Sequence, residues 1–502
     1  MTIYNINLGI GWASSGVEYA QAYRSKVFAN IGVDAKFIFM DFIPQANISD
    51  LTRNIGFKDE QIIWLYTYFT DQKIGPTTMT LAKLLQSFDG EVDRVEKGNN
   101  SVRYFMKGQD TFLTAYLQQE NTDIVHRVEY VSGGHLIRKD FYTDIRSFTE
   151  YYTPRDNQAH LYMRRFFNRD GSVGLEEIID GDSKLYRLKN AIFYSKEELI
   201  GHFIKALKMT AQDIVILDRA TGTGQAVLRN VKPAKVGVVI HAEHFSENAV
   251  TEDTILWNNY YEYQFTNADK IDFFVTATEK QKELVSEQFQ KYTKHRPVIY
   301  AIPVGSLDQL REPTKERKPF SLITASRLAT EKHVDWLTKA VIEARKVLPE
   351  LTFDIYGVGG QDSKIRDIIK ENQAESYIRL CGHHDLTDIY QDYQLYLSAS
   401  KSEGFGLTLL EAVGSGLPLI GFDVRYGNQT FIRDGENGYM IPRPDIDDEK
   451  VIVVQFAEKI IQIFRHHDLE KLHQVSYALA SDYLRDKVEA KWGQLIKEVS
   501  HA

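Results

Sequence analysis

The strongest constraint on the fold is a strand, glycine loop, helix, strand order at the start of the chain. Residues 3–8 form an apolar strand that runs into Gly9, Gly11 and Gly16, and residues 17–28 follow with helical periodicity. A second buried-type strand spans residues 33–41. This order is typical of a parallel βαβ unit, so the chain is predicted to open as half of a doubly wound sheet.

A different pattern begins at about residue 89 and continues to residue 189. Short alternating runs are separated by turn residues about every 8 to 12 positions, which predicts antiparallel hairpins. The two clearest hairpins join residues 92–96 to 102–107 and residues 124–131 to 135–142. A third predicted hairpin has its strand at 161–168 and its turn at 169–171. Aromatic residues are dense here, and they either form an exposed binding surface or simply cover one face of the sheet. They are Tyr104, Phe105, Phe112, Tyr116, Tyr130, Phe141, Tyr142, Phe166 and Phe167.

Strand and helix alternation then returns and fills the rest of the chain. Predicted strands lie at 213–217, 236–241, 272–276 and 297–302, and after a charged linker at 315–318 they lie at 320–325, 352–356, 378–381, 395–398 and 418–422. A chain of 502 residues exceeds what one core supports. We therefore expect an α/β protein with two Rossmann-like domains facing a cleft and an antiparallel β-sheet domain inserted in the first.

The expected boundaries follow from these changes of pattern. Residues 1–78 and 195–314 form the first Rossmann-like domain, 79–194 the inserted sheet, and 315–486 the second Rossmann-like domain. Residues 487–502 are predicted to form a helix that crosses back to the first domain.

Composition narrows the functional classes. A net charge of -9 and a pI near 5.9 argue against nucleic acid as a partner, because phosphate backbones require clustered cations. Cys381 is the only cysteine, so an intrachain disulfide is excluded and a reducing compartment is indicated. No stretch approaches the roughly 20 apolar residues that a membrane span needs. We expect a cytoplasmic protein, and peripheral association with the inner face of the membrane is compatible with these features.

The densest chemical signal lies between Ser400 and Pro418. Glu403 follows a predicted strand and Glu411 comes eight positions later, inside the next helix. The glycines between them allow close approach of a ligand to amides at a helix N-terminus, where phosphate or sugar hydroxyls are favoured. The alternative is a solvated helix that carries two carboxylates by chance. The residues expected to contact such a ligand are Glu403, Gly404, Phe405, Gly406, Leu407, Thr408 and Glu411.

Two cations follow the first strand of the second α/β run. Arg327 comes directly after Ser326, and Lys332 follows five residues later. Arginine supplies planar bidentate donors and lysine a point charge, so the pair can stabilise a leaving diphosphate. A surface charge pair at a helix start is the competing interpretation.

Two further turns end neighbouring strands at the same predicted sheet edge. Tyr356 and Gly357 form a tight strand-to-helix turn, and Gly382, His383 and His384 end the next strand. Ligands of open α/β sheets bind at this edge. These residues are expected to frame the base of a nucleotide, although the histidines could also be satisfied turn residues.

His241 ends a predicted strand and is expected to contact the donor sugar. The run from His241 to His244 resembles the spacing of metal ligands, but no further ligand cluster accompanies it in the sequence. We therefore expect no metal site. Structural packing of His241 is the third interpretation. Asp180, Gly181 and Asp182 are interpreted as a hairpin turn rather than a metal site.

At the start of the first helix, four residues are predicted to offer amides to the donor diphosphate. They are Gly16, Val17, Glu18 and Tyr19. The glycine spacing before them does not fit a dinucleotide fingerprint.

Taken together, these positions resemble the donor site of the GT4 family of retaining glycosyltransferases. The resemblance implies the GT-B architecture, no cofactor and no metal. It also implies catalytic roles for His241, Arg327, Lys332, Glu403 and Glu411. The departing phosphate is expected to take the acceptor proton.

The N-terminal run from Asn7 to Ala20 and the inserted sheet further resemble the catalytic A subunits of accessory-Sec glycosyltransferase pairs. That resemblance implies transfer of N-acetylglucosamine from UDP-GlcNAc to serine or threonine of a serine-rich repeat adhesin before its export. A homologous B subunit is the implied partner, and the inserted sheet would engage acceptor and partner. Two alternatives stay open: a teichoic acid α-glucosyltransferase, which such chains also resemble, and a non-catalytic glycan-binding adaptor.

Overall fold

The computed structural model describes residues 1–12, 14–44, 46–88, 90–444 and 446–501. The chain divides into two compact units, Met1–Val239 with Trp257–Asp272 and Ile240–Leu256 with Phe273–Ala502. Each unit is described by itself. The domain boundaries expected from the sequence stay predictions.

A parallel sheet forms the centre of the first unit. Five strands lie in the order β3-β2-β1-β14-β15, and β1 is paired with β2 on one side and β14 on the other. The strands are β1 (Ile3–Asn7), β2 (Ala35–Phe39), β3 (Ile62–Trp64), β14 (Ile214–Leu217) and β15 (Lys235–Ile240). Helix α1 (Gly16–Asn30) connects β1 to β2, so the predicted opening βαβ unit is confirmed. The other helices of this part are α2 (Ile48–Asn54), α3 (Leu65–Tyr68), α5 (Lys196–Ala206), α6 (Gly224–Asn230) and α7 (Glu262–Thr266).

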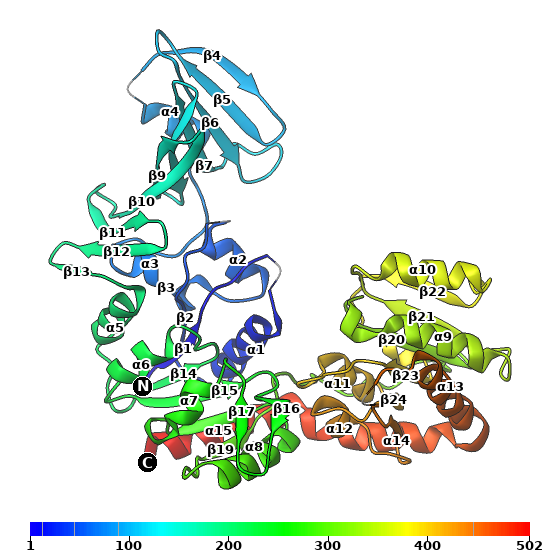
Figure 1. Cartoon of the computed structure of the whole chain (residues 1–502). Coiled ribbons are helices and arrows are strands. Elements are labelled where there is room, and N and C mark those ends of the chain that lie inside the picture. Colours follow the sequence, from blue (N-terminus) through cyan, green and yellow to red (C-terminus); the bar gives the residue numbers. More distant parts are fainter. Residues whose placement is uncertain (13, 45, 89, 445, 502) are drawn as a thin grey trace. The chain divides into compact units, whose positions relative to one another are not determined.

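Ten antiparallel strands follow one another in sequence order within the first unit (Figure 1). The predicted hairpins β4/β5, β7/β8 and β10/β11 are confirmed, and residues 181–182 turn β11 into β12 as expected. Helix α4 (Leu81–Gln86) contributes Leu84 to a core under the sheet. The strands are β4 (Val92–Lys97), β5 (Ser101–Met106), β6 (Thr111–Leu117), β7 (Val125–Ser132), β8 (His135–Tyr142), β9 (Arg146–Arg155), β10 (Gln158–Phe167), β11 (Val173–Asp180), β12 (Ser183–Leu188) and β13 (Ala191–Phe193).

Most of the aromatic residues in this sheet cover a face rather than form an open binding surface. Tyr104, Tyr130, Tyr142, Phe166 and Phe167 are buried. Others are covered by cations that lie over their rings, as Arg103 lies over Phe112 and Arg127 over Tyr116. The structure therefore favours the packing interpretation for the buried rings.

A buried ion network crosses the middle of the sheet. The Arg164 guanidinium on β10 donates to Glu150 of β9 at 2.9 Å and to Glu177 of β11 at 2.8 Å. It also lies 3.9 Å over the ring of Phe42, which packs edge-on against Phe148. One arginine thus joins three strands of the insertion to the segment that follows β2.

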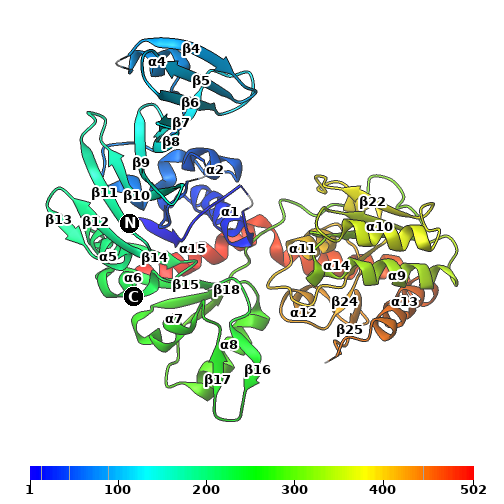
Figure 2. The same ribbon diagram turned by 45° about the horizontal axis from the view of Figure 1, so that its top comes forward.

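The second unit contains a six-stranded parallel sheet in the order β22-β21-β20-β23-β24-β25. Figure 2 labels its strands β22, β24 and β25. Its strands are β20 (Ser321–Ala325), β21 (Thr352–Tyr356), β22 (Ile378–Gly382), β23 (Leu395–Ser398), β24 (Leu419–Phe422) and β25 (Gly438–Ile441). Its helices are α9 (Val334–Arg345), α10 (Asp362–Glu371), α11 (Leu407–Gly414), α12 (Gly427–Phe431), α13 (Glu449–His466), α14 (Leu469–Ala480) and α15 (Arg485–His501). The same unit holds strand β16 (Phe245–Val250), helix α8 (Glu279–Tyr292) and the parallel pair β18 (Phe273–Thr276) and β19 (Ile299–Ala301).

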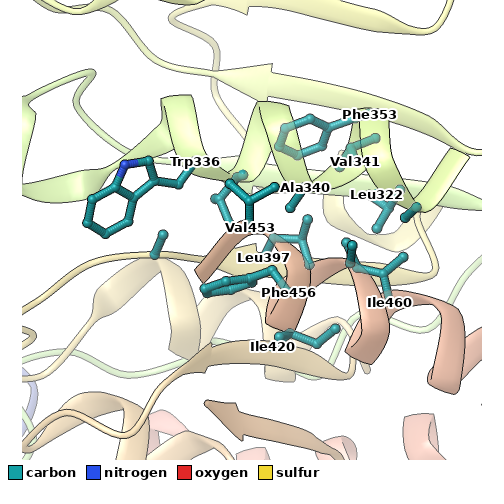
Figure 3. Close-up of a cluster of buried hydrophobic side chains, with 14 of the residues drawn as sticks. Leu322, Trp336, Ala340, Val341, Phe353, Leu397, Ile420, Val453, Phe456 and Ile460 are labelled. Atoms are coloured by element: carbon teal, nitrogen blue, oxygen red, sulfur yellow. The ribbon is translucent and has the colours of Figure 1, made fainter. Parts of the chain in front are cut away.

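Apolar side chains from this sheet, α9 and α13 interlock in one core (Figure 3). Leu322 and Leu397 of the strands meet Val341 of α9 and Phe456 of α13, all fully buried. A second core on Ile323 and Leu419 includes Leu409 of α11 and Leu479 of α14. Because helices cover both faces, the sheet leaves only its edges and strand ends for ligands.

None of the described helices is long and apolar enough to cross a membrane.

Removing Arg164 is expected to destabilise the inserted sheet. Arg164→Met leaves the carboxylates of Glu150 and Glu177 without their shared cation, which costs about 3–5 kcal/mol for a buried pair. Thermal unfolding followed by circular dichroism should show a lowered transition. Arg155→Met is the matched control, since Arg155 is 76% exposed and its neighbour Asp156 is 3.9 Å away. Equal midpoints for both variants would contradict the prediction.

Candidate functional site

The site assembles around Glu403, in the loop between β23 and α11. The Glu403 carboxylate forms an ion pair with Lys332, and the Lys332 ammonium also lies 3.2 Å from the Ser400 hydroxyl. Both charged side chains are 18% exposed. The predicted cation and the predicted carboxylate are therefore neighbours, although they are 71 positions apart in sequence.

The backbone of Glu403 is fixed by the loop that follows β24. Its carbonyl accepts hydrogen bonds from the amides of Tyr426 and Gly427, both at 2.8 Å. Gly427 is required here, because a Cβ at this position would overlap the Phe405 carbonyl oxygen. Sequence reasoning missed Tyr426 and Gly427, and their only signal is a tyrosine and a glycine after a strand.

Helix α11 begins directly after Gly406, which has φ of +85° and serves as the N-cap. Thr408 in the first turn lies 3.1 Å from the buried Tyr396 hydroxyl, which also lies 3.0 Å from the Ala325 carbonyl. The predicted geometry of a glycine loop leading into a helix start is confirmed. This helix start offers amides beside the Lys332–Glu403 pair.

Glu411 lies at the other end of the motif, in α11. Tyr390 donates a hydrogen bond to its carboxylate at 3.1 Å. Part of Glu411 is exposed, yet surrounding protein desolvates the carboxyl and raises its pKa, and the Tyr390 bond partly offsets this. Such a carboxylate has free oxygen capacity for ribose hydroxyls.

Arg327 differs from Lys332 in its surroundings. Its side chain is 80% exposed and lies 3.5 Å from Glu331, one helical turn along the chain. The preceding residue, Ser326, is held by a bond from its amide to the Tyr356 carbonyl at 3.1 Å. Arg327 thus has a fixed backbone and an exposed guanidinium, which suits a diphosphate ligand but also fits a surface pair.

The predicted turn residues lie in one row along the strand ends. The Gly357 amide donates to the Gly382 carbonyl at 2.7 Å, and the His384 ring meets the Tyr356 ring edge-on at 5.8 Å. Gly357 has φ of +132°, and a Cβ there would overlap the Ser326 carbonyl oxygen. The glycine is therefore required by the neighbouring loop, a reason different from the close nucleotide approach expected from the sequence. His383 and His384 are exposed.

Three residues beneath this row were missed. The Tyr393 hydroxyl donates to Asp354 at 2.5 Å and lies 3.1 Å from the Tyr356 hydroxyl. Burial and the Asp354 hydrogen bond raise the pKa of Tyr393. Arg379 binds Asp354 with two hydrogen bonds, at 2.7 and 2.5 Å. This series of hydrogen bonds fixes the Tyr356 ring, and no local sequence motif predicts it.

His241 lies beside the Glu403 loop, and its contact with a donor sugar stays a prediction. Its carbonyl oxygen would be 3.0 Å from a Cβ on Gly404, so the two backbones are in close contact. His244, three positions later, is fully buried, lying 2.7 Å from Gln288 and 3.0 Å from the Tyr426 hydroxyl. Tyr426 also donates to Glu243. His244 is therefore a packing residue.

The four predicted donor residues of the first unit lie at the start of α1. Ser15 caps this helix and forms a capping box with Glu18, and its oxygens accept from the amides of Val17, Glu18 and Tyr19. The Glu18 side chain is buried and bonds Asn7. The expectation that all four amides face a diphosphate is thus corrected: the cap occupies three of them, and Gly16 stands outside it.

No group of three or more potential metal ligands lies together in the part of the chain that the structure describes. Metal-independent chemistry stays a prediction.

Comparison with known proteins identifies the family. The family described as the GtfA extended beta-sheet domain matches residues 94–190, and that described as Glycosyl transferases group 1 matches residues 319–466. A UDP-N-acetylglucosamine–peptide N-acetylglucosaminyltransferase GtfA subunit from Streptococcus gordonii is 58% identical over 500 residues, covering 99% of each chain. This chain belongs to the GtfA subunit family.

Solved structures agree with this assignment. A GtfA/B complex contains a chain with a TM-score of 0.98 and 57% identity, covering 100% of both chains. The pneumococcal O-GlcNAc transferase GtfA in complex with UDP and GlcNAc gives a TM-score of 0.91 and 55% identity, covering 100% of this chain and 99% of that chain. The GT-B architecture and the glycosyltransferase class expected from the sequence are confirmed.

Gly357→Ala is expected to weaken UDP binding at least tenfold. The added Cβ pushes the Ser326 carbonyl and so displaces the loop that carries Arg327. Calorimetric titration with UDP measures the change. Gly360→Ala, where a Cβ meets nothing within 4 Å, is the matched control and should stay within about twofold of wild type. Equal affinities for the two variants would disprove this account of Gly357.

Burial lowers the pKa of His244 to about 4. Because the unfolded imidazole titrates near 6.5, the folded state binds fewer protons between these values, and stability falls as the pH drops through this window. The full effect is about 3 kcal/mol for a shift of this size. His244→Gln should lose this part of the acid sensitivity, measured as the difference in unfolding free energy between pH 7.5 and 5.

The exposed His466 of α13 provides the control, as His466→Gln. If His244→Gln and His466→Gln show the same pH dependence as wild type, the buried neutral state of His244 is refuted.

Proposed function

We propose that the protein transfers N-acetylglucosamine from UDP-GlcNAc to serine and threonine hydroxyls of a serine-rich polypeptide, with retention of anomeric configuration. One observation carries the proposal. Lys332, Ser400 and Glu403 meet at the strand ends of the second unit, in a chain 58% identical to a protein named UDP-N-acetylglucosamine–peptide N-acetylglucosaminyltransferase GtfA subunit.

The described residues support distinct roles on the donor. Lys332 and the exposed Arg327 stabilise the β-phosphate as UDP leaves, because they supply a point charge and a bidentate fork. Amides at the start of α11 contribute further donors. Glu403 and His241 orient the sugar, and Glu411 accepts hydrogen bonds from ribose hydroxyls.

The Lys332–Glu403 pair has a mechanistic consequence. Lys332 shares its charge between a carboxylate and whatever anion approaches, so phosphate binding weakens the ion pair and frees Glu403 to accept from a sugar hydroxyl. Donor phosphate and donor sugar are thereby coupled through one contact. A donor that lacks either the phosphate or the sugar therefore loses more binding free energy than the hydrogen bonds of the missing part supply.

The base of the nucleotide fits the row of strand ends. Tyr356 is held by Tyr393 and the Asp354–Arg379 pair, so its ring is a rigid surface next to Gly357 and Gly382. A planar base stacks on such a ring with little loss of side-chain freedom. This supports binding of a nucleotide base at the end of the row.

In the cell, the proposal places the chain in the cytoplasm, with peripheral association at the inner face of the membrane. It acts with a homologous B subunit on a serine-rich repeat adhesin before accessory-Sec export. The support is the family membership, and a GtfA/B complex is one of the similar solved structures.

The proposal is tested by incubating the chain, alone and with its B subunit, with UDP-GlcNAc or UDP-glucose and either a serine-rich peptide or a polyol-phosphate polymer. Mass spectrometry of the products should show N-acetylhexosamine on the peptide only, also in EDTA. Transfer of glucose to the polymer instead would establish the teichoic acid alternative. Absence of both UDP binding, measured by calorimetry, and transfer to any acceptor would favour the adaptor.

Lys332→Ala is expected to lower kcat about 10²–10³-fold, since it removes one preorganised charge worth about 3 kcal/mol in the transition state. Arg327→Ala should also lower kcat. Lys339→Ala is the matched control, because Lys339 pairs only with Glu449 among the contacts found for it, on the surface of α9. Initial rates with peptide measure all three. Turnover within twofold of wild type for both site variants would rule out these roles.

A further inference from the structure

A recess lies next to Glu403, and all the residues that line it belong to the second unit. Its volume is about 990 Å³, which is large enough for several residues of an extended chain. Its walls carry six charged residues: Glu243, Glu247, Lys401, Asp423, Arg425 and Arg443. None of the predicted donor contacts lines this recess, and those that follow β20, β21 and β22 lie on the opposite side of β23, so the recess is a separate place on the sheet edge.

The walls come from the ends of three adjacent parallel strands. Lys401 and Ser402 follow β23, Asp423 and Arg425 follow β24, and Arg443 follows β25. Carboxyl ends of parallel strands are where open α/β sheets bind ligands. The fourth wall is the segment of Glu243 and Glu247 at β16.

The recess adjoins the catalytic loop directly. Ser402 precedes Glu403, and the Glu403 amide lies 3.4 Å from the Arg425 carbonyl. The donor contacts Arg327, Tyr356 and Gly382 lie at or just after the ends of β20, β21 and β22 on one side of β23, while the recess lies toward β24 and β25 on the other side. Glu403 thus stands between the two, where a second substrate must come to meet the sugar.

The charges of the recess are balanced. Three carboxylates face three cations, and Arg425 pairs with Glu247 at 2.8 Å while Lys401 pairs with Asp447. A polyanion such as a polyol-phosphate chain would gain little here, because binding repeated phosphates needs an excess of cations. The amides of Asn248 and Gln429 add donors and acceptors to the same wall. This mixture matches a neutral, hydroxyl-rich polypeptide, whose backbone needs both.

We propose that this recess binds the acceptor polypeptide and presents its serine or threonine hydroxyl beside Glu403. The proposal rests on the proposed function and names the acceptor subsite within it. The carboxylates accept from peptide N–H and side-chain O–H groups, and Arg443 donates to peptide carbonyls. Arg425 keeps the wall rigid, because it bonds Glu247 and lies over the Phe245 ring at 5.0 Å.

Glu247→Gln and Arg443→Ala should each raise the KM for a serine-rich peptide at least fivefold. The KM for UDP-GlcNAc and the Kd for UDP should stay within twofold of wild type, since neither residue contacts the donor row. Glu252→Gln is the matched control: Glu252 is an exposed carboxylate after the same strand and outside the recess. It should leave both constants unchanged.

A blocking experiment tests the location without relying on altered charge. In a Cys381→Ser background, Arg443→Cys provides one thiol at the rim of the recess, and its reaction with a bulky maleimide is followed by mass. Serine-rich peptide should slow the reaction at least threefold, whereas polyol-phosphate polymer should not. The labelled protein should lose transfer to peptide and retain UDP binding.

The outcomes separate the two proposals. If wild type transfers sugar to peptide but the variants keep its KM and peptide gives no protection, the recess proposal is overturned and the proposed function stands. Protection by the polymer would overturn it in favour of an anionic acceptor. If wild type modifies no polypeptide at all, the proposed function falls, and this subsite with it.

Discussion

The carbonyl oxygen of Glu403 is the constraint on which the site depends. By accepting from the amides of Tyr426 and Gly427, it joins the loop after β23 to the loop after β24. The side chain of the same residue pairs with Lys332 after β20. Glu403 therefore connects the loops that follow three strands, and we call this point the Glu403 junction. The start of α11 follows directly in sequence, so its position depends on this junction. Any change that moves Tyr426 moves the carboxylate and the helix start together.

This junction explains why buried polar groups gather around it. Tyr426 reaches Glu243 and His244 through its hydroxyl, and Tyr393 reaches Asp354 on the other side of the sheet edge. A buried hydroxyl or carboxylate without a partner destabilises the fold by more free energy than one hydrogen bond contributes to it. The polar groups are consequently paired in chains, and the pairing holds the loops in one arrangement. Rigidity at the strand ends is what preorganised charge stabilisation requires.

The sequence predicted the elements and the motif but not the pairings between distant residues. Apolar runs and turn residues located the βαβ opening, the hairpins and the second sheet, because periodicity is a local property. Glu403, Lys332 and His241 were predicted from strand ends, since the carboxyl edge is set by topology. Tyr426, Asp354 and Arg164 were missed because each acts through a partner that no local spacing reveals. The helix cap at Ser15 has a sequence signal, a serine followed three residues later by Glu18, that was not used in the prediction.

Charge is distributed unevenly along the edge of the second sheet, and this distribution follows from chemistry. On the side of β20, Arg327 and Lys332 have only Glu331 and Glu403 as the acidic partners found for them, so an arriving diphosphate competes with one carboxylate for each cation. On the side of β24 and β25, carboxylates and cations are equal in number. A leaving group that gains negative charge needs the first environment, and a neutral nucleophile needs the second. Glu403 lies between the cationic side and the balanced side of the sheet edge, so its one carboxylate can interact with the leaving group's surroundings and with the nucleophile. Its charge is paired with Lys332 until a phosphate competes for that cation.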